Sequence, residues 1–156
     1  MTREGFDRLV AEIDRLWHEE RPMVTAEVSA AAEMGDRSEN AAYIYGKKRL
    51  RAIDSRLRYL RRKVDNVQPV DLAGLPPSDR VKWGAIVDLE DEDGAARTYR
   101  LVDKEESEPG AGRISVQSPL GLALLGKEVG DVVTVKRPLG DIEYEIVDLR
   151  FGGGSP

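Results

Sequence analysis

The stretch Gly35-Asp36-Arg37-Ser38-Glu39-Asn40 separates two long segments whose apolar residues recur every three or four positions. The apolar positions before it are Phe6, Leu9, Ile13, Leu16, Met23, Val24, Val28 and Ala31. Those after it are Tyr43, Leu50, Ile53, Leu57, Leu60, Val64 and Val67. This spacing is typical of two helices that each bury one stripe against the other. The sequence therefore predicts an antiparallel coiled-coil hairpin over residues 1–67, with the quoted stretch as its turn.

The first helical segment contains Pro22. A proline removes a backbone N–H and clashes with the preceding helical turn, so we expect a kink here. The apolar stripe shifts by one position just after this proline, which fits that expectation. A helix of about 30 residues spans roughly 45 Å. The turn is therefore predicted to lie at the far end of a long, narrow rod.

Beyond the hairpin, prolines and glycine in residues 68–79 break the helical period and predict a linker. From residue 80 onward the apolar period changes to two, with strands expected over 81–89, 98–103, 113–117, 132–136 and 142–149. One short helix is expected between them, with Ser118 as its N-cap, Pro119 at its first position and Gly126 after its end. The fold class is therefore α+β: a helical hairpin, then a small antiparallel β-sheet domain over 80–151 and a flexible tail over 152–156.

Composition limits the possible chemistry. The chain has 156 residues, 40% of them hydrophobic, no cysteine and one histidine, His18. A disulfide framework, a thiol nucleophile, a Cys/His zinc site and a Ser-His-Asp triad at the turn are therefore excluded or disfavoured. Acids from Glu4 onward interrupt any signal-peptide core, and no apolar run approaches the roughly 20 residues of a membrane span. We expect a cytoplasmic protein whose metal, if any, is Mg²⁺ or Mn²⁺ held by oxygen atoms.

Charge is distributed unevenly along the chain, whose net charge is −5. Residues 1–67 carry 14 Lys and Arg against 12 Asp and Glu, whereas residues 68–156 carry 10 against 17. Between residues 47 and 63 there are nine basic residues and one acid, Asp54. Such a helix could simply be well solvated, but the lack of mixed signs favours contact with RNA or DNA. The predicted contact residues are Lys47, Lys48, Arg51, Arg58 and Arg62.

Asp36 and Glu39 in the turn admit two interpretations. An acid at the N-cap with Glu three residues later is close to a capping box, which is purely structural. Alternatively, the two carboxylates bind Mg²⁺. They are too few for an ion that requires six oxygen ligands, so the site would be shared with another protein. In that case Asp36 and Glu39 would be both metal ligands and catalytic residues of a two-metal phosphodiester cleavage.

The chain resembles the bacterial Gre transcript-cleavage factors. The resemblance is carried by residues 35–41, by Tyr43 with Lys47-Lys48-Arg49-Leu50, and by residues 118–131, including Ser118-Pro119-Leu120. Leu16-Trp17 and residues 19–22 make it most similar to the GreB branch. The sequence differs from the common family pattern at Ala42 and Gln117, where an acid is frequent.

This resemblance implies a C-terminal domain of FKBP-like shape and RNA polymerase as the partner. The hairpin would enter the secondary channel of the polymerase, and Asp36 and Glu39 would help bind a second Mg²⁺. The polymerase would then cut the 3′ end of backtracked nascent RNA, which the basic helix would hold. Docking on the channel rim would use Gln117, Ser118, Pro119 and Leu120.

The resemblance thus predicts a monomeric accessory factor that is not an enzyme by itself. A non-cleaving inhibitor that occupies the same channel is the main alternative, although the Asp36–Glu39 pair favours cleavage. A free-standing RNA-binding coiled coil would leave the acidic C-terminal domain without a role. Prolyl isomerase activity is disfavoured, because the domain has too few aromatic residues for the lining of such a pocket.

Overall fold

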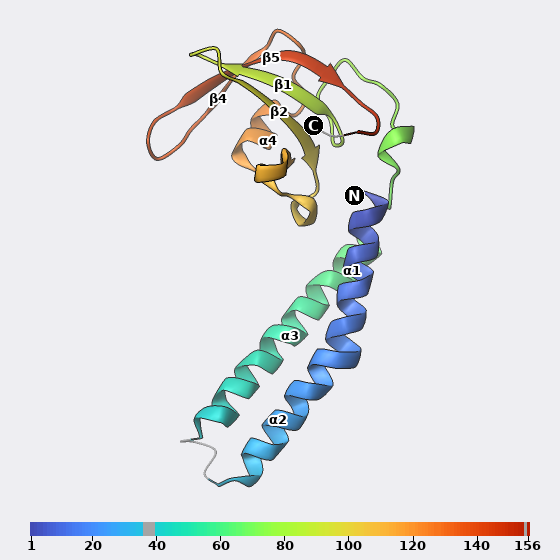
Figure 1. Ribbon diagram of the computed structural model, residues 1–156, viewed down its shortest axis with the longest axis vertical. Coiled ribbons are helices and arrows are strands. Elements are labelled where there is room, and N and C mark those ends of the chain that lie inside the picture. Colours follow the sequence, from blue (N-terminus) through green and yellow to red (C-terminus); the bar gives the residue numbers. More distant parts are fainter. Residues whose placement is uncertain (36–39, 155) are drawn as a thin grey trace. The chain divides into compact units, whose positions relative to one another are not determined.

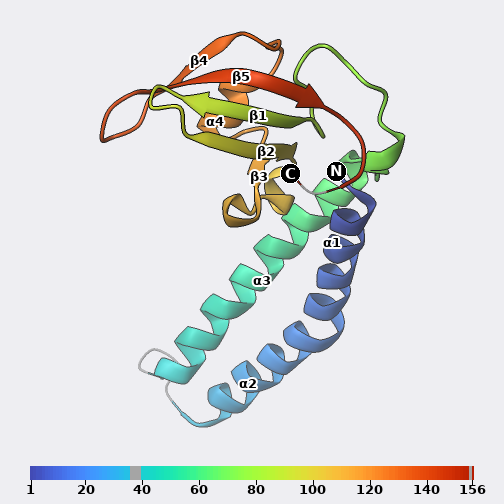
Figure 2. The same ribbon diagram turned by 45° about the horizontal axis from the view of Figure 1, so that its top comes forward.

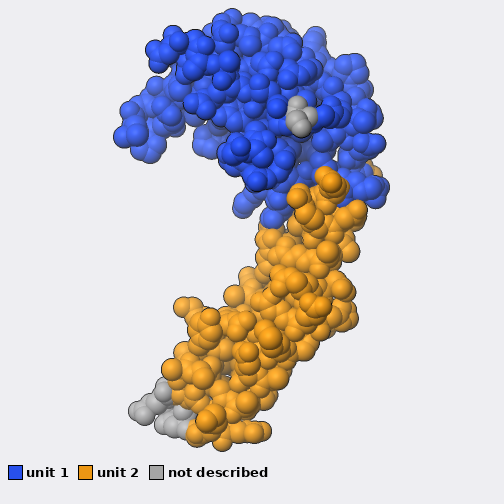
Figure 3. Space-filling model, viewed as in Figure 1, with its two compact units in different colours: residues 1–3, 69–156 blue, residues 4–68 orange. Residues whose placement is uncertain are grey.

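A computed structural model describes residues 1–35, 40–154 and 156. The chain divides into two compact units (Figure 3). Residues 4–68 form one unit, called here the hairpin unit. Residues 1–3 and 69–156 form the other, called the β unit.

The hairpin unit consists of two antiparallel helical arms (Figure 1). The outgoing arm contains α1 (Arg3–Arg15), the π-helical turn η1 (Leu16–Glu20) and α2 (Arg21–Glu33), and the returning arm is α3 (Ala41–Asn66). Their shared seam buries Leu9, Leu16, Val24, Ala31, Gly46, Ile53, Leu57 and Leu60. A Cβ on Gly46 would lie 2.7 Å from a methyl carbon of Val28, so any larger residue would force the Val28 side chain or the arms to shift. The predicted coiled-coil hairpin is confirmed.

A π-helical turn explains the shift in the apolar stripe. The backbone N–H of Arg21 bonds to the carbonyl of Leu16, five residues back, so this turn holds one more residue than an α-helical turn. Pro22 follows directly, and the arm bends where α1 passes into α2 (Figure 2). The prediction that Met23 lies in the seam is wrong, because the added residue changes the register. Val24 is fully buried, and Met23 is half exposed.

Asn40 closes the tip end of the hairpin. Its side-chain oxygen accepts the Tyr43 N–H at 3.1 Å, and its amide donates to the Ala31 carbonyl at 2.6 Å. The N-cap of α3 is therefore Asn40. The capping-box interpretation of the turn, which needed Asp36 at that position, is wrong.

The β unit contains a five-stranded sheet with the order β3-β2-β1-β5-β4. Its strands are β1 (Ile86–Asp91), β2 (Ala96–Val102), β3 (Arg113–Ser115), β4 (Val132–Val135) and β5 (Ile142–Arg150). Three pairings are antiparallel, as expected, but β3 pairs parallel with β2 at the edge of the sheet. The first strand begins at Ile86, and Val81 instead exchanges backbone hydrogen bonds of 2.8 Å with Gly126 and Lys127.

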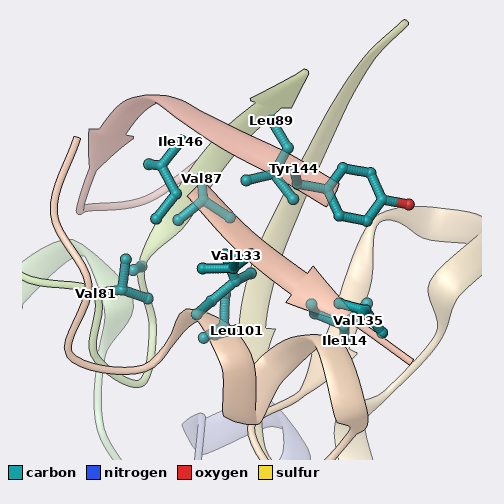
Figure 4. Close-up of a cluster of buried hydrophobic side chains, with 11 residues drawn as sticks. Val81, Val87, Leu89, Leu101, Ile114, Val133, Val135, Tyr144 and Ile146 are labelled. Carbon is teal, nitrogen blue, oxygen red and sulfur yellow. The ribbon is translucent and has the colours of Figure 1, made fainter. Parts of the chain in front are cut away.

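One face of this sheet and the short helix α4 (Pro119–Leu124) enclose the core of the β unit. Figure 4 shows Val87, Leu89, Leu101 and Ile146 pointing into this shared interior. Alternating residues of each strand face inward because successive side chains point to opposite faces of a sheet. The α+β fold predicted from the change of period, with its single short helix, is confirmed. Short 3₁₀ turns lie at η2 (Leu72–Gly74), η3 (Lys104–Glu106) and η4 (Pro109–Ala111).

The segment after β5 is held by Arg100. This side chain is 2% exposed and donates hydrogen bonds to the carbonyls of Gly84, Gly152 and Gly154 at 2.8–2.9 Å. A buried guanidinium needs acceptors, and the tail glycines supply two of them. The carbonyls of Gly152 and Gly154 are thus tied to the β unit, and the flexibility of the tail stays a prediction.

Candidate nucleic-acid interface and hairpin tip

The two predicted metal ligands, Asp36 and Glu39, lie outside the described residues. Their neighbours on both sides are placed. The first arm ends at Glu33, and Gly35 has a φ of 131°, a conformation that strongly favours glycine. On the other side Asn40 caps α3.

Five predicted contact residues, Lys47, Lys48, Arg51, Arg58 and Arg62, follow the side of α3 that faces away from the seam, and we call them the outer stripe. Four of them are exposed, and Lys47 is half-buried. No ion pair joins Lys48, Arg51 or Arg62 to a carboxylate in the part of the chain that the structure describes. Their RNA-binding role stays a prediction.

Other basic residues of α3 hold the two arms together. The guanidinium of Arg56 donates two hydrogen bonds, of 2.9 and 3.0 Å, to Glu12. Arg49 pairs with Glu27 at 3.2 Å on the same side of the seam. The contact set predicted from the sequence left out Arg49 and Arg56 but did not assign them to pairs between the arms.

On the opposite side of the seam, Arg21 pairs with Asp54 at 2.7 Å. This hydrogen bond is the main reason that the pKa of Asp54 is lowered from its usual value, and the positive charge of Arg58 acts in the same direction. Asp54 is the one acid within the basic segment of α3, and its charge is already compensated across the hairpin. It therefore neutralises little of the outer stripe.

Two exposed aromatic side chains lie beside these arginines. Trp17 is 45% exposed, with the guanidinium carbons of Arg21 and Arg61 5.5 and 5.0 Å from its ring centre. Tyr45 is 63% exposed and has Arg49 5.9 Å from its ring centre.

The predicted docking loop lies in the β unit, between β3 and α4. The Ser118 hydroxyl donates to the Ser115 carbonyl at 2.6 Å and accepts the Gly121 N–H at 3.1 Å, which confirms the predicted N-cap. A Cβ on Gly121 would lie 2.1 Å from the Ser115 carbonyl oxygen, so this position requires glycine. The loop is therefore tightly held.

The predicted docking residues in and beside this loop differ in their exposure to solvent. Gln117 and Pro119 are exposed, whereas Leu120 is half-buried and packs against the core. Leu122 was not among the predicted residues and is 61% exposed. Its position three residues after Pro119 on a short helix places it on the same side of that helix.

No group of three or more His, Cys, Asp or Glu side chains that could hold a metal ion occurs among residues 1–35, 40–154 and 156. In the same described ranges, no helix combines the length and apolar character needed to cross a membrane.

The fold and site define a class of protein in which a basic helical hairpin is followed by a small β unit. Comparison with known sequences identifies this class. Residues 1–68 match the family model "Transcription elongation factor, N-terminal", and residues 76–151 match "Transcription elongation factor, GreA/GreB, C-term". The chain therefore belongs to the GreA/GreB family of transcription elongation factors, on its GreB branch.

Individual relatives agree with this assignment. The chain is 49% identical to transcription elongation factor GreB of Pseudomonas aeruginosa, over 97% of this chain and 89% of the relative. It is 42% identical to transcription elongation factor GreA of Thioalkalivibrio sulfidiphilus, over 97% and 96%. A solved structure, that of GreA factor homolog 1 (Gfh1) of Thermus thermophilus, is 25% identical and covers 96% of this chain and 97% of its own, with a TM-score of 0.44. By these sequence matches the protein is a Gre-type transcription elongation factor.

Proposed function

We propose that this protein inserts its hairpin into the secondary channel of RNA polymerase and stimulates cleavage of the 3′ end of backtracked nascent RNA. The polymerase active centre would carry out the hydrolysis, and this chain would act as an accessory factor. The outer stripe of α3 carries the proposal: this row of cations leads along the hairpin toward a turn that contains two acids, and Lys48, Arg51 and Arg62 have no ion pair among the described residues.

Capping of α3 does not require the acids of that turn. Asn40 provides the N-cap of α3, so helix capping does not require Asp36. Carboxylate oxygens are the ligands that Mg²⁺ prefers, and Asp36 and Glu39 would supply two of the six that it needs. The remaining ligands would come from the polymerase, its RNA and water. When bound, the ion would lower the pKa of the attacking water.

The other charges of the hairpin would serve positioning. Exposed cations such as Lys48 and Arg51 would attract the phosphates of the extruded RNA. The Arg56–Glu12, Arg49–Glu27 and Arg21–Asp54 pairs join the two arms and would help the hairpin keep its shape inside the channel. The rigid loop with Gln117 and Pro119 would dock on the rim of the channel.

The test mixes stalled, backtracked elongation complexes with the protein and Mg²⁺ and follows transcript length. We expect the wild type to shorten the RNA and Asp36→Asn to lose most of this activity, because an amide binds Mg²⁺ far less well than a carboxylate. Stability should stay unchanged, since Asn40 still caps α3. Glu33→Gln is the matched control, because it removes an exposed charge at the end of α2 and should leave cleavage intact.

Three results would contradict the proposal. If the wild type blocks RNA synthesis without shortening transcripts, the protein is a channel inhibitor. If Asp36→Asn lowers activity only in proportion to a loss of folded protein, the acid is structural. If Asp36→Asn and Glu33→Gln weaken cleavage equally, the effect comes from general charge near the tip.

A further inference from the structure

Trp17 stands out among the aromatic residues of the hairpin. It belongs to the π-helical turn η1, where its neighbour Leu16 is buried in the seam while Trp17 itself is 45% exposed. A hollow of about 540 Å³ adjoins the indole ring and is lined by Trp17, Arg21, Pro22, Thr25 and Ala26. Segments of π-helix are frequently found at functional sites.

The two arginines beside this ring differ in whether a carboxylate pairs with them. The guanidinium of Arg21 is compensated by Asp54 at 2.7 Å. No carboxylate pairs with Arg61 within the described ranges, yet its guanidinium carbon lies 5.0 Å from the ring centre. The partly exposed indole that lines the hollow therefore also contacts the guanidinium of Arg61, which has no counter-ion among the described residues.

A partly exposed indole beside an uncompensated guanidinium is the combination that binds single-stranded nucleic acid. Bases stack on aromatic rings regardless of sequence, and arginines contact the adjoining phosphates. Arg61 also lies between Arg58 and Arg62 of the outer stripe in the sequence of α3. The contact between Trp17 and Arg61 therefore involves a residue that adjoins, in the sequence, the cations that are predicted to contact RNA.

We propose that Trp17 and Arg61 form a second RNA contact on the hairpin, at which a base stacks on the indole and its phosphate pairs with Arg61. This inference rests on the proposed function, which supplies the single-stranded RNA. From the start of α3 at Ala41 to Arg61 the helix rises roughly 30 Å at 1.5 Å per residue. That is the length of about nine stacked nucleotides at 3.4 Å each, and of fewer extended ones. Transcripts extruded by only one or two nucleotides therefore end well short of Trp17.

Fluorescence provides a direct test, because the chain has only two tryptophans. In a Trp83→Phe protein, Trp17 is the sole reporter, and we expect a short unstructured RNA to quench it as the RNA saturates its site. The anisotropy of a labelled copy of the same RNA measures binding independently. In the mirror variant Trp17→Phe, the reporter is Trp83, whose ring nitrogen is buried in the β unit, and its emission should not change.

Trp17→Ala should weaken RNA binding about fivefold or more, and Trp17→Phe, which keeps a stacking ring, should recover most of the affinity. Circular dichroism verifies that both variants fold, so a merely structural role for the indole would not produce this difference. RNA binding without quenching of Trp17 overturns the inference and leaves the proposed function standing. Quenching by RNA polymerase but not by RNA also overturns it, and shows instead that the ring contacts a polypeptide surface.

Cleavage assays separate this inference from the function on which it rests. Trp17→Ala should slow cleavage several-fold more in complexes backtracked by many nucleotides than in complexes backtracked by one or two. If Trp17→Ala affects both kinds of complex equally, or neither, while Asp36→Asn abolishes cleavage of both, the second contact is wrong and the cleavage function holds. If the wild type cleaves neither, the proposed function fails first.

Discussion

Arg100 in the β unit and Arg51 in the hairpin are both arginines without a carboxylate partner among the described residues, but their surroundings differ. Arg100 is almost completely buried and donates to three backbone carbonyls. Arg51 is exposed on the outer face of α3, with no acceptor among the described residues. The first arrangement uses a charge to organise the fold, and the second leaves a charge available for a partner. Substitutions at the two positions should accordingly affect different properties.

Arg100→Leu should destabilise the β unit by about 2–4 kcal/mol, because the carbonyls of Gly84, Gly152 and Gly154 lose a buried donor. Burial also lowers the pKa of Arg100, with the charge of Arg150 acting in the same direction. The tail hydrogen bonds are thus part of what compensates a costly buried cation.

The measurement is urea unfolding followed through Trp83 in a Trp17→Phe background, so that only the β unit is reported. Arg97→Leu, an exposed position on the same strand β2, is the matched control and should change stability by less than about 0.5 kcal/mol. Equal losses for the two variants would mean that the buried hydrogen bonds of Arg100 contribute little.

The Arg21–Asp54 pair is intermediate between these extremes, since both side chains are about one-third exposed. The pKa of Asp54 is lowered in the folded chain, mainly by its hydrogen bond from Arg21. The pair therefore stabilises the hairpin above the usual pKa of an aspartate, and this contribution is lost as the pH falls through the lowered value. Because solvent screens this pair, we expect the effect on stability to be small.

Unfolding of the hairpin unit, followed through Trp17 in a Trp83→Phe background, should show this loss of stability as the pH falls below about 4. Asp54→Asn should reduce this dependence of stability on pH and leave the stability in strongly acidic solution unchanged. If the dependence of stability on pH is unchanged in that variant, other carboxylates of the hairpin cause it.

Sequence periodicity predicted the hairpin and the change to a β unit because burial of apolar side chains dictates both patterns. The π-helical turn could not be deduced, because Pro22 restricts its own turn without specifying how the preceding backbone adapts. Asp36 and Asn40 are both good cap residues, and only the hydrogen bonds of Asn40 to Tyr43 and Ala31 distinguish them.

The same limit applies to charged residues. The sequence placed the outer stripe on one helix face, since helix geometry fixes which residues lie together. It could not assign Arg49 and Arg56 to cross-arm pairs, because that depends on which acids of the facing helix come within reach. Burial of Arg100 was equally hidden, since its acceptors are backbone carbonyls distant in sequence. Three-residue β3 is too short for its periodicity to reveal a parallel partner.

Replacing Lys48 and Arg51 together by alanine should leave the stability of the hairpin almost unchanged, because both positions are exposed and alanine is the best helix former. RNA contact should weaken, so that efficient cleavage of long extruded RNA requires lower salt. The dependence of binding on salt should also become shallower, because about two phosphate contacts are lost.

The matched control is Arg49→Ala with Arg56→Ala, which removes the same charge from residues engaged with Glu27 and Glu12. That control should lower the free energy of unfolding and change the salt dependence less, since those guanidinium groups are already paired. Equal salt dependence in the two double variants would show that the whole basic helix, rather than the outer stripe, contacts the RNA.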